Sequence, residues 1–282
     1  MPCGRLRESA LGYYNISPGE KEAPKTVKGA SFVGLRRVFC CDMIRENKDW
    51  SDLMRIVFVR HGHPDYKLDC LTELGHRHAE AAADRLADEP FTKIYSSTCG
   101  RAVETAEHIA ARHNLPVESF DFMREIRWGS IDGEPLPHKG GYPWAVANAM
   151  VENGETLMDP NWAEEGAFAN NSVKYLVQNI AVEFDKLLET LGYVREGEYY
   201  RVARDNPETV AMVSHGGSGT AVLAHLFNIP FPMCCNMIRM DFTGITVVKF
   251  TGAEGTLTAP RFEILTDNRH IGNIDSEIVF GV

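Results

Sequence analysis

Two histidines and two arginines have the types and the spacing needed for chemistry on an anion. Arg60 and His61 stand side by side before Gly62, Arg101 lies within the run SSTCGRAVETA, and His215 precedes a pair of glycines. Guanidinium groups can bind two oxygens of a phosphoryl group at once and keep their charge. A neutral imidazole can attack phosphorus as a nucleophile. If the four side chains converge, they predict a site that holds and transfers a phosphoryl group.

Each of these groups follows a stretch that we expect to form a buried strand. Residues 54–59, 93–96 and 209–214 are short runs rich in apolar residues, which is typical of buried strands. Helical periodicity comes after them, first from Thr72 as an N-cap and most clearly over residues 169–191. Strands and helices that alternate in this way predict an α/β protein, a three-layer α/β/α sandwich with a mostly parallel central sheet. Such sheets bind ligands at the carboxyl ends of their strands, where the four side chains are expected to lie.

The remaining elements are expected to complete this sheet. Residues 117–120 are predicted to form another short strand, and a helix over residues 221–227 follows the glycines after His215. Apolar runs at residues 236–242, 245–250 and 261–265 are predicted to be the last strands. A late strand such as 236–242 offers an edge through which two copies of the chain could form a homodimer.

The order of the motifs resembles that of the histidine phosphatase superfamily, whose fold is called phosphoglycerate mutase-like. The resemblance rests on Arg60-His61-Gly62, on the pattern Ser-Ser-x-x-x-Arg-Ala-x-x-Thr-Ala around Arg101, on the stretch around Glu125 and on Ser-His-Gly-Gly around His215. It covers roughly residues 54–270 and points to the branch of bacterial-type phosphatases.

The resemblance implies a role for each of these residues. His61 would be the nucleophile that forms a phosphohistidine. Glu125 would be the acid that protonates the leaving oxygen and then activates water, which requires surroundings that raise the pKa of its carboxyl group. His215, in its cationic form, would help to stabilise the charge of the transition state. The residues implied to bind the phosphate are Arg60, Arg101, Gly62 and Gly216, with Gly216 and Gly217 letting the backbone of a helix start approach closely.

Three positions leave more than one interpretation open. Glu125 can instead form a plain ion pair with Arg124 or Arg127. His63 departs from the family pattern, in which a small polar or acidic residue usually follows the glycine, and it either lines the pocket or caps the turn. Pro64 departs as well and stiffens a loop that often carries a hydroxyl group toward the phosphate. These two departures leave the shape of the loop, and with it the substrate preference, open.

The chain is expected to consist of two parts. Residues 1–53 mix Gly, Pro, Lys and Glu without sustained periodicity, and we expect them to be a poorly ordered N-terminal extension. Residues 54–282 are expected to form one histidine phosphatase domain. Within it, residues 130–170 correspond to the insert that members of the family carry over the active site. Trp128 and Trp144 are candidate pocket residues: Trp128 would help to raise the pKa of Glu125, and Trp144 either packs in the core of the insert or faces the non-phosphate part of the substrate.

The charge of that insert separates two activities of the family. A mutase must grip a small polyanion, and the family's mutases have an arginine pair in this region. Between Gly129 and Val173 this sequence has one lysine, Lys139, no arginine and seven acidic residues. The insert therefore favours a hydrolase acting on a small-molecule phosphate ester, with phosphoglycerate mutase-type phosphoryl transfer as the alternative.

Composition argues against several other classes. The net charge of −10 leaves no basic excess for binding nucleic acid or an anionic membrane, and no apolar run is long enough to cross a bilayer. Seven cysteines without a C-x-x-C spacing indicate no disulfide framework and fit a reducing cytoplasm. The mechanism that the resemblance implies uses no metal and no organic cofactor.

Two further classes remain as remote alternatives. The spacing His61-x-His63 after a first strand is also how a metal-dependent amidohydrolase begins, although Arg60 and Arg101 would repel a divalent cation. The chain also lacks the repetition expected of a (β/α)₈ barrel. A non-catalytic module that binds a phosphorylated ligand could have the same fold, but every catalytic position of the family is filled here.

Overall fold

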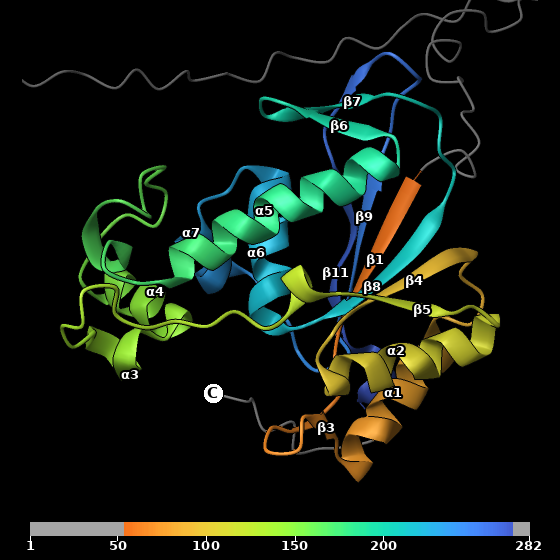
Figure 1. The fold of residues 1–282 in the computed structure, drawn as a ribbon, viewed down its shortest axis with the longest axis horizontal. Helices are drawn as coiled ribbons and strands as arrows, with labels where there is room; N and C mark the ends of the chain where they lie inside the picture. The colour runs from red at the N-terminus through yellow and green to blue at the C-terminus, as the bar shows by residue number, and fades with distance from the viewer. Residues whose placement is uncertain (1–53, 273–282) are drawn as a thin grey trace, which may run out of the picture. The chain divides into compact units, whose positions relative to one another are not determined.

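The computed structural model describes residues 54–272, and its centre is a six-stranded sheet (Figure 1). The strand order is β11-β9-β1-β8-β4-β5; β1, β8, β4 and β5 run parallel, and β9 and β11 are antiparallel to their neighbours. The predicted α/β fold with a mostly parallel sheet is confirmed. The predicted extension at residues 1–53 lies outside the described residues. The strands are β1 (Met54–Arg60), β4 (Phe91–Ser97), β5 (Val117–Phe120), β8 (Thr209–Ser214), β9 (Ile245–Phe250) and β11 (Arg261–Asp267).

The central strand β1 is buried on both faces. Ile56 and Phe58 belong to one core, which they share with α5 (Val173–Thr190) and α6 (Gly216–Phe227). Val57 and Val59 belong to a second core with α1 (Glu73–Arg85) and α2 (Gly100–His113). Successive residues of a strand point to opposite faces of the sheet, so an unbroken apolar run serves both cores. Figure 1 shows the two helix pairs on opposite sides of β1 and β8.

Two helices begin at the edge of the sheet where β1 ends. α2 begins at Gly100, three residues after β4, and α6 begins at Gly216, two residues after β8. Because β1, β4 and β8 are parallel, the N-termini of both helices lie at the same edge as Arg60 and His61. A helix N-terminus carries unpaired N–H groups and a partial positive charge, which favours anions there.

The predicted strand at residues 236–242 is wrong. The segment contains the end of α7 (Phe231–Met237), followed by a loop that crosses the end of β1. Phe231, Cys234 and Cys235 are all buried at helical spacing, and proline near the helix start favours a helix. The edge proposed there for a homodimer therefore does not exist, and a homodimer stays a prediction without that support.

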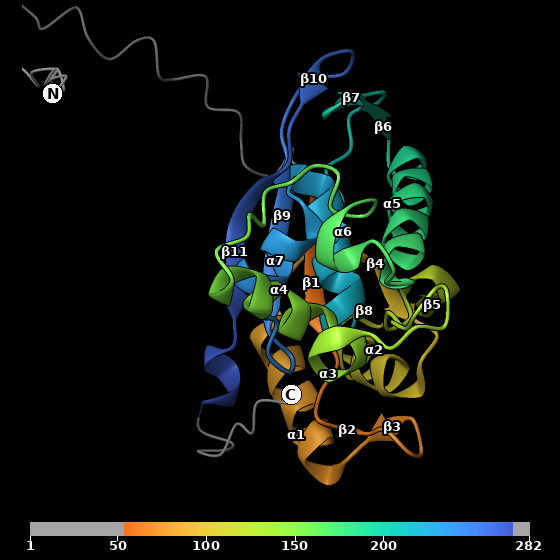
Figure 2. The ribbon, with the colours of Figure 1, turned by 90° about the vertical axis from the view of Figure 1, so that its left-hand side faces the viewer.

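Two small sheets were not predicted, and they lie at opposite ends of the described part (Figure 2). One is a hairpin directly after the His61 motif, made of β2 (Pro64–Asp65) and β3 (Cys70–Leu71). The other has the order β10-β7-β6. Its strands are β6 (Tyr193–Glu196), β7 (Tyr199–Val202) and β10 (Leu257–Thr258).

The insert at residues 130–170 contains little regular structure apart from α3 (Pro137–Gly141), α4 (Pro143–Glu152) and the short 3₁₀ helix η3 (Gly166–Phe168). α4 packs beside α7, where Asn236 Nδ2 donates to Asn148 Oδ1 at 3.2 Å. The buried Asn171 donates to the Gly141 carbonyl at 2.8 Å and so ties the insert to the start of α5. Its action as a lid stays a prediction. Within residues 54–272, no helix combines the length and apolarity that a membrane span requires.

Candidate active site

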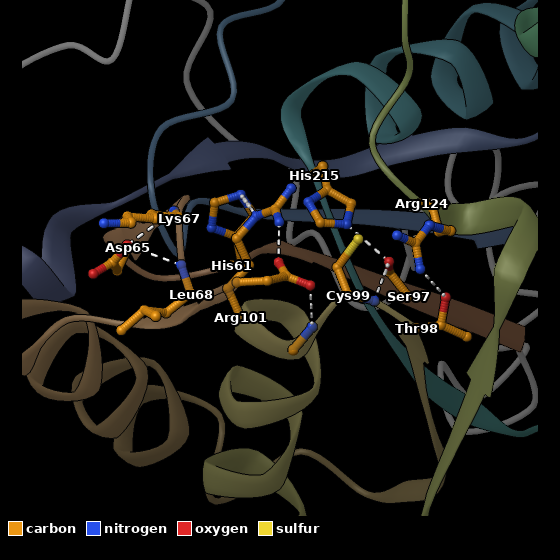
Figure 3. A network of polar contacts seen from close by, with 12 residues as sticks. His61, Asp65, Lys67, Leu68, Ser97, Thr98, Cys99, Arg101, Arg124 and His215 are labelled. Atoms are coloured by element: carbon orange, nitrogen blue, oxygen red, sulfur yellow. Dashed lines mark hydrogen bonds and ion pairs between the residues drawn. The ribbon is translucent and has the colours of Figure 1, made fainter.

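His61 lies fully buried at the end of β1 with one ring nitrogen directed at a backbone carbonyl. Figure 3 shows its ring beside the Arg101 side chain. Its Nδ1 is 2.7 Å from the Gly62 oxygen. A carbonyl can only accept, so Nδ1 carries the hydrogen and Nε2 keeps its lone pair. Arg101 Nε donates to that Nε2 at 3.3 Å. The nitrogen that would attack phosphorus therefore faces a guanidinium group.

The surroundings of His61 keep its ring neutral. Burial lowers the pKa of His61 well below its ordinary value, and nearby His215 and Arg60 lower it further. The ring centroids of His61 and His215 are 5.0 Å apart. A neutral ring whose Nε2 carries no hydrogen is the form that a nucleophile requires.

Arg101 projects from the first turn of α2 and is almost fully buried. Its Nη1 forms an ion pair with Asp69 of the β2–β3 hairpin. The threonine of its motif, Thr105, donates to the Arg101 carbonyl at 2.8 Å and accepts from the Gly62 N–H at 3.0 Å. Thr105 thereby links the loop of the nucleophile to the helix that carries the arginine.

The loop after α7 holds the Arg60 side chain, a contact that was not predicted from the sequence. Arg60 Nη1 donates to the Met240 carbonyl at 2.6 Å, and its guanidinium lies 4.3 Å from the centroid of the Phe242 ring. The same ring lies 5.7 Å from that of His61. Sequence reasoning missed Met240 and Phe242 because it assigned them to a strand. One available signal was Gly244 just after the segment, because glycine often marks a turn.

His215 is the N-cap residue of α6 and is fully buried. Its Nε2 lies 2.8 Å from Ser97 Oγ. Burial lowers the pKa of His215 well below its ordinary value, and Arg101 and Arg60 add to this. The site as described therefore favours a neutral His215, whereas the resemblance implies a cation. A phosphate dianion beside the ring would shift the pKa upward.

Glu125 lies against the N-terminus of α6. Its Oε1 accepts from the N–H groups of Ile126 at 2.9 Å, Gly217 at 2.9 Å and Ser218 at 3.3 Å. Burial raises the pKa of its carboxyl group, although Arg60 and the Ile126 N–H oppose the shift. Glu125 forms no ion pair within the described chain, so the interpretation as a plain ion pair with Arg124 or Arg127 is wrong.

The glycines of the motifs differ in what they permit. A Cβ on Gly217 would lie 2.4 Å from Glu125 Oε1, whereas a Cβ on Gly216 would meet Arg60 at an ordinary 3.7 Å. Gly217 is thus the residue that allows the backbone of α6 to lie close to the Glu125 carboxyl group. A Cβ on Gly62 would lie 2.5 Å from the Gly75 carbonyl, so Gly62 lets its loop rest on α1. Phosphate binding by Gly62 and Gly216 stays a prediction.

A cleft of about 1200 Å³ opens beside Arg101 and Glu125. Trp128, 39% exposed, is one of the residues that line it. Trp144 instead packs against the main core, with its ring 5.1 Å from that of Tyr142. His63 places Nδ1 2.9 Å from Thr72 Oγ1, which favours its role in the turn. The other walls of the cleft are formed by Tyr66, Phe122, Arg124, Arg127 and the α5 residues Asn179 and Glu183.

The amidohydrolase alternative fails on the fold. It requires a closed eight-stranded barrel, whereas the described strands form an open six-stranded mixed sheet. Within residues 54–272, no three His, Cys, Asp or Glu side chains are grouped as metal ligands would be. Independence of the activity from metal stays a prediction.

Comparison with known proteins agrees with this fold. Over 185 residues the chain is 28% identical to the glucosyl-3-phosphoglycerate phosphatase of Mycobacterium tuberculosis, covering 62% of this chain and 76% of that protein. The native structure of the mycobacterial enzyme superposes with a TM-score of 0.51 at 24% identity, covering 75% of this chain and 98% of the other. A phosphoserine phosphatase from Entamoeba histolytica in complex with 3-phosphoglyceric acid superposes with a TM-score of 0.50 at 22% identity, covering 77% and 99%.

These relatives are similar to the chain in fold, and the first also in sequence. Residues 56–169 match the histidine phosphatase superfamily (branch 1). This range contains the His61, Arg101 and Glu125 motifs, and the remaining motif, at His215, is brought to the same site by β8. The chain belongs to the histidine phosphatase superfamily, branch 1.

Proposed function

We propose that this protein hydrolyses a small phosphomonoester through a phosphohistidine on His61. The observation that carries the proposal is the tautomer of His61. Its Nδ1–H is fixed by the Gly62 carbonyl, and its Nε2 lone pair faces Arg101. That arrangement prepares a nucleophile beside a group that can neutralise a phosphoryl oxygen.

In the first step, His61 Nε2 forms a bond to phosphorus and the bond from phosphorus to the ester oxygen breaks. Arg60 and Arg101 offset the negative charge of the phosphoryl oxygens. The leaving oxygen takes a proton from Glu125. Since Oε1 of Glu125 already accepts three backbone N–H bonds, the proton belongs on Oε2. The raised pKa of Glu125 supports this protonated form.

In the second step, water attacks the phosphohistidine. Glu125, now a carboxylate, takes the proton of that water, and the bond between His61 and phosphorus breaks. Inorganic phosphate leaves, and both residues return to their first states. One carboxyl group can serve as acid and then as base because its pKa lies above the ordinary range of a glutamate.

The cleft next to Glu125 is the proposed place of the leaving group. It combines apolar walls, such as Trp128, with charged groups, such as Arg127 and Glu183. A polar metabolite with several hydrogen-bonding groups fits such a lining. The names of the relatives, glucosyl-3-phosphoglycerate phosphatase and phosphoserine phosphatase, also refer to small phosphate esters.

Phosphoglycerate mutase-type transfer is the alternative within the family. The cleft carries the cations Arg101, Arg124 and Arg127, and it also carries four carboxyl groups, at Asp69, Asp121, Glu125 and Glu183. The insert adds further acidic residues. Because the positive and negative groups of the site offset one another, it should bind a doubly charged phosphate ester weakly. This supports hydrolysis over transfer.

The test is phosphate release from an aryl phosphate and a panel of metabolite phosphates in EDTA. We expect turnover by the wild type and a loss of at least about 10⁴-fold in His61→Ala. His76→Ala, which removes an exposed histidine of α1, should retain full activity. Acid-labile labelling of the wild type by ³²P, absent in His61→Ala, would identify the phosphohistidine. Turnover that survives in His61→Ala would rule out this mechanism.

A further inference from the structure

The β2–β3 hairpin brings two side chains to Arg101. Asp69 forms an ion pair with Arg101 Nη1, and the Tyr66 ring lies 5.3 Å from the guanidinium carbon. The Arg101 side chain is 9% exposed and that of Asp69 is 42% exposed. A half-exposed carboxylate thus reaches from solvent to the most deeply buried cation of the site.

The position of Asp69 is fixed by its own backbone and by α2. Its φ is +55°, in the left-handed region that Asp and Asn tolerate better than most residues. Its second carboxylate oxygen accepts from the Gly100 N–H at 3.0 Å. A Cβ on Gly100 would lie 2.2 Å from the Asp69 carbonyl, so the hairpin rests directly on the first turn of α2.

The nitrogen that Asp69 binds determines which edge of the guanidinium remains available. In arginine, Nη1 lies on the side of Cδ, whereas Nε–H and Nη2 form the edge that grips two oxygens side by side. Arg101 Nε donates to His61 Nε2, so this edge faces the nucleophile. Asp69 binds Nη1 only, and it leaves the Nε/Nη2 edge to the phosphoryl group.

We propose that Asp69 is a positioning residue, which holds the guanidinium of Arg101 so that its Nε/Nη2 edge faces the phosphoryl group on His61. The proposal rests on the proposed function, in which Arg101 binds that group. Asp69 also lines the cleft, but it forms no bond to His61 and acts on the phosphoryl group through Arg101. Its effect is greatest in the transition state, where the planar phosphoryl group and the guanidinium edge must be aligned.

The test compares Asp69→Ala, Asp69→Asn and Asp65→Asn with the wild type. Asp65 is the matched control because it belongs to the same hairpin, where it accepts from the N–H groups of Lys67 and Leu68 (Figure 3). We measure kcat, KM, the inhibition constants of orthovanadate and inorganic phosphate, and the melting temperature. Vanadate adopts the five-coordinate geometry of phosphoryl transfer and phosphate does not, so the two inhibitors separate alignment from simple charge.

Asp69→Ala should lower kcat/KM by about tenfold to a hundredfold, mostly in kcat. It should weaken vanadate more than phosphate, with a lowered melting temperature because alanine tolerates the left-handed backbone less well than Asp or Asn. Asp69→Asn keeps a neutral acceptor for Nη1 and tolerates the left-handed backbone, so its loss should be smaller. Asp65→Asn removes the same charge from the same hairpin and should behave as the wild type.

Two results would overturn the role of Asp69. One is wild-type kcat/KM and vanadate inhibition in Asp69→Ala. The other is tighter binding of phosphate in Asp69→Ala, which would make Asp69 a competitor of the phosphoryl group. A wild type without turnover on any ester would instead contradict the proposed function. The positioning role of Asp69 would then be tested by calorimetry of vanadate binding to the wild type and Asp69→Ala. Equal affinities of the two proteins would reject that role.

Discussion

A carboxyl group lies at one end of α6 and a guanidinium group at the other, in the positions that a helix favours. At the N-terminus, the Glu125 carboxyl group accepts from the N–H groups of Gly217 and Ser218. At the C-terminus, Arg195 donates to the His225 carbonyl at 3.3 Å and also to the Asn228 side chain. Both placements complement the helix dipole, since its N-terminus is partly positive and its C-terminus partly negative.

The two ends differ in how completely the protein pairs its own polar groups. Around the N-terminus, three buried atoms have no hydrogen-bond partner among the described protein groups: Arg60 Nε, Ser214 Oγ and His215 Nδ1. At the C-terminus, His225 Nε2 also lacks a hydrogen bond, but it lies 2.8 Å from Asp185 Oδ1, and the Tyr200 hydroxyl donates to Asp185 at 2.9 Å and accepts from Arg195 at 2.8 Å. Unpaired buried groups cost stability, so the N-terminal end is built for a ligand and the C-terminal end for the fold.

Glu125→Gln should have the largest effect among the variants that test the difference between the two ends of α6. We expect kcat to fall by about 10²–10⁴-fold, because the amide cannot give the leaving group a proton. Its oxygen can still accept from the backbone of α6, so the melting temperature should not fall. Glu118→Gln, on the exposed side of β5, is the matched control and should retain wild-type activity.

The pH profile sharpens the same test. The pKa of Glu125 is raised, so kcat/KM should decline with rising pH only above the ordinary range of a glutamate, as the acid loses its proton. The pKa of His61 is lowered, so the acid limb should lie below the ordinary pKa of histidine. Glu125→Gln should lose the alkaline limb and keep the acid limb. An unchanged alkaline limb in this variant would assign the acid to another group.

A second, smaller effect is expected from Gly217→Ala. The added methyl group would overlap Glu125 Oε1 and Ile126 Cγ1, at 2.4 and 2.3 Å. Relief of this overlap requires Glu125 to move, which should cost about 1–3 kcal/mol of unfolding free energy and about tenfold in kcat/KM. Gly216→Ala meets only ordinary contacts and should lose much less of both. Equal losses in kinetics and urea denaturation for the two variants would contradict the assignment of the close approach to Gly217.

The position of the site at the N-terminal end of α6 could be predicted from the sequence. The apolar runs of β1, β4 and β8 are long enough to indicate strands, and a parallel sheet brings their carboxyl ends together. His61, Arg101 and His215 were therefore placed correctly at one edge. The lowered pKa of His215 was not foreseen, because it depends on burial and on guanidinium groups that only the fold brings near.

Contacts between distant short segments were out of reach of the sequence. The strands of the β2–β3 hairpin have two residues each, too few for a periodic pattern, yet they carry Asp69 to Arg101. The loop containing Met240 and Phe242 was mistaken for a strand because its residues are apolar, and its contact with Arg60 spans 180 residues. Apolar content alone does not distinguish a strand from a loop that packs beneath a site.

The smallest effect is expected at the C-terminal end of α6, in Arg195→Met. This change removes donors to Tyr200, to the His225 carbonyl and to Asn228 and keeps much of the apolar stem. The loss should be about 1–3 kcal/mol of unfolding free energy in urea denaturation, with kcat/KM unchanged. Arg201→Met is the matched control in the same small sheet: its partner Glu196 is half exposed, so the loss should be clearly smaller than in Arg195→Met. A fall in kcat/KM for Arg195→Met at constant stability would show that the two ends of α6 are coupled, and the division between an end for the ligand and an end for the fold would then be wrong.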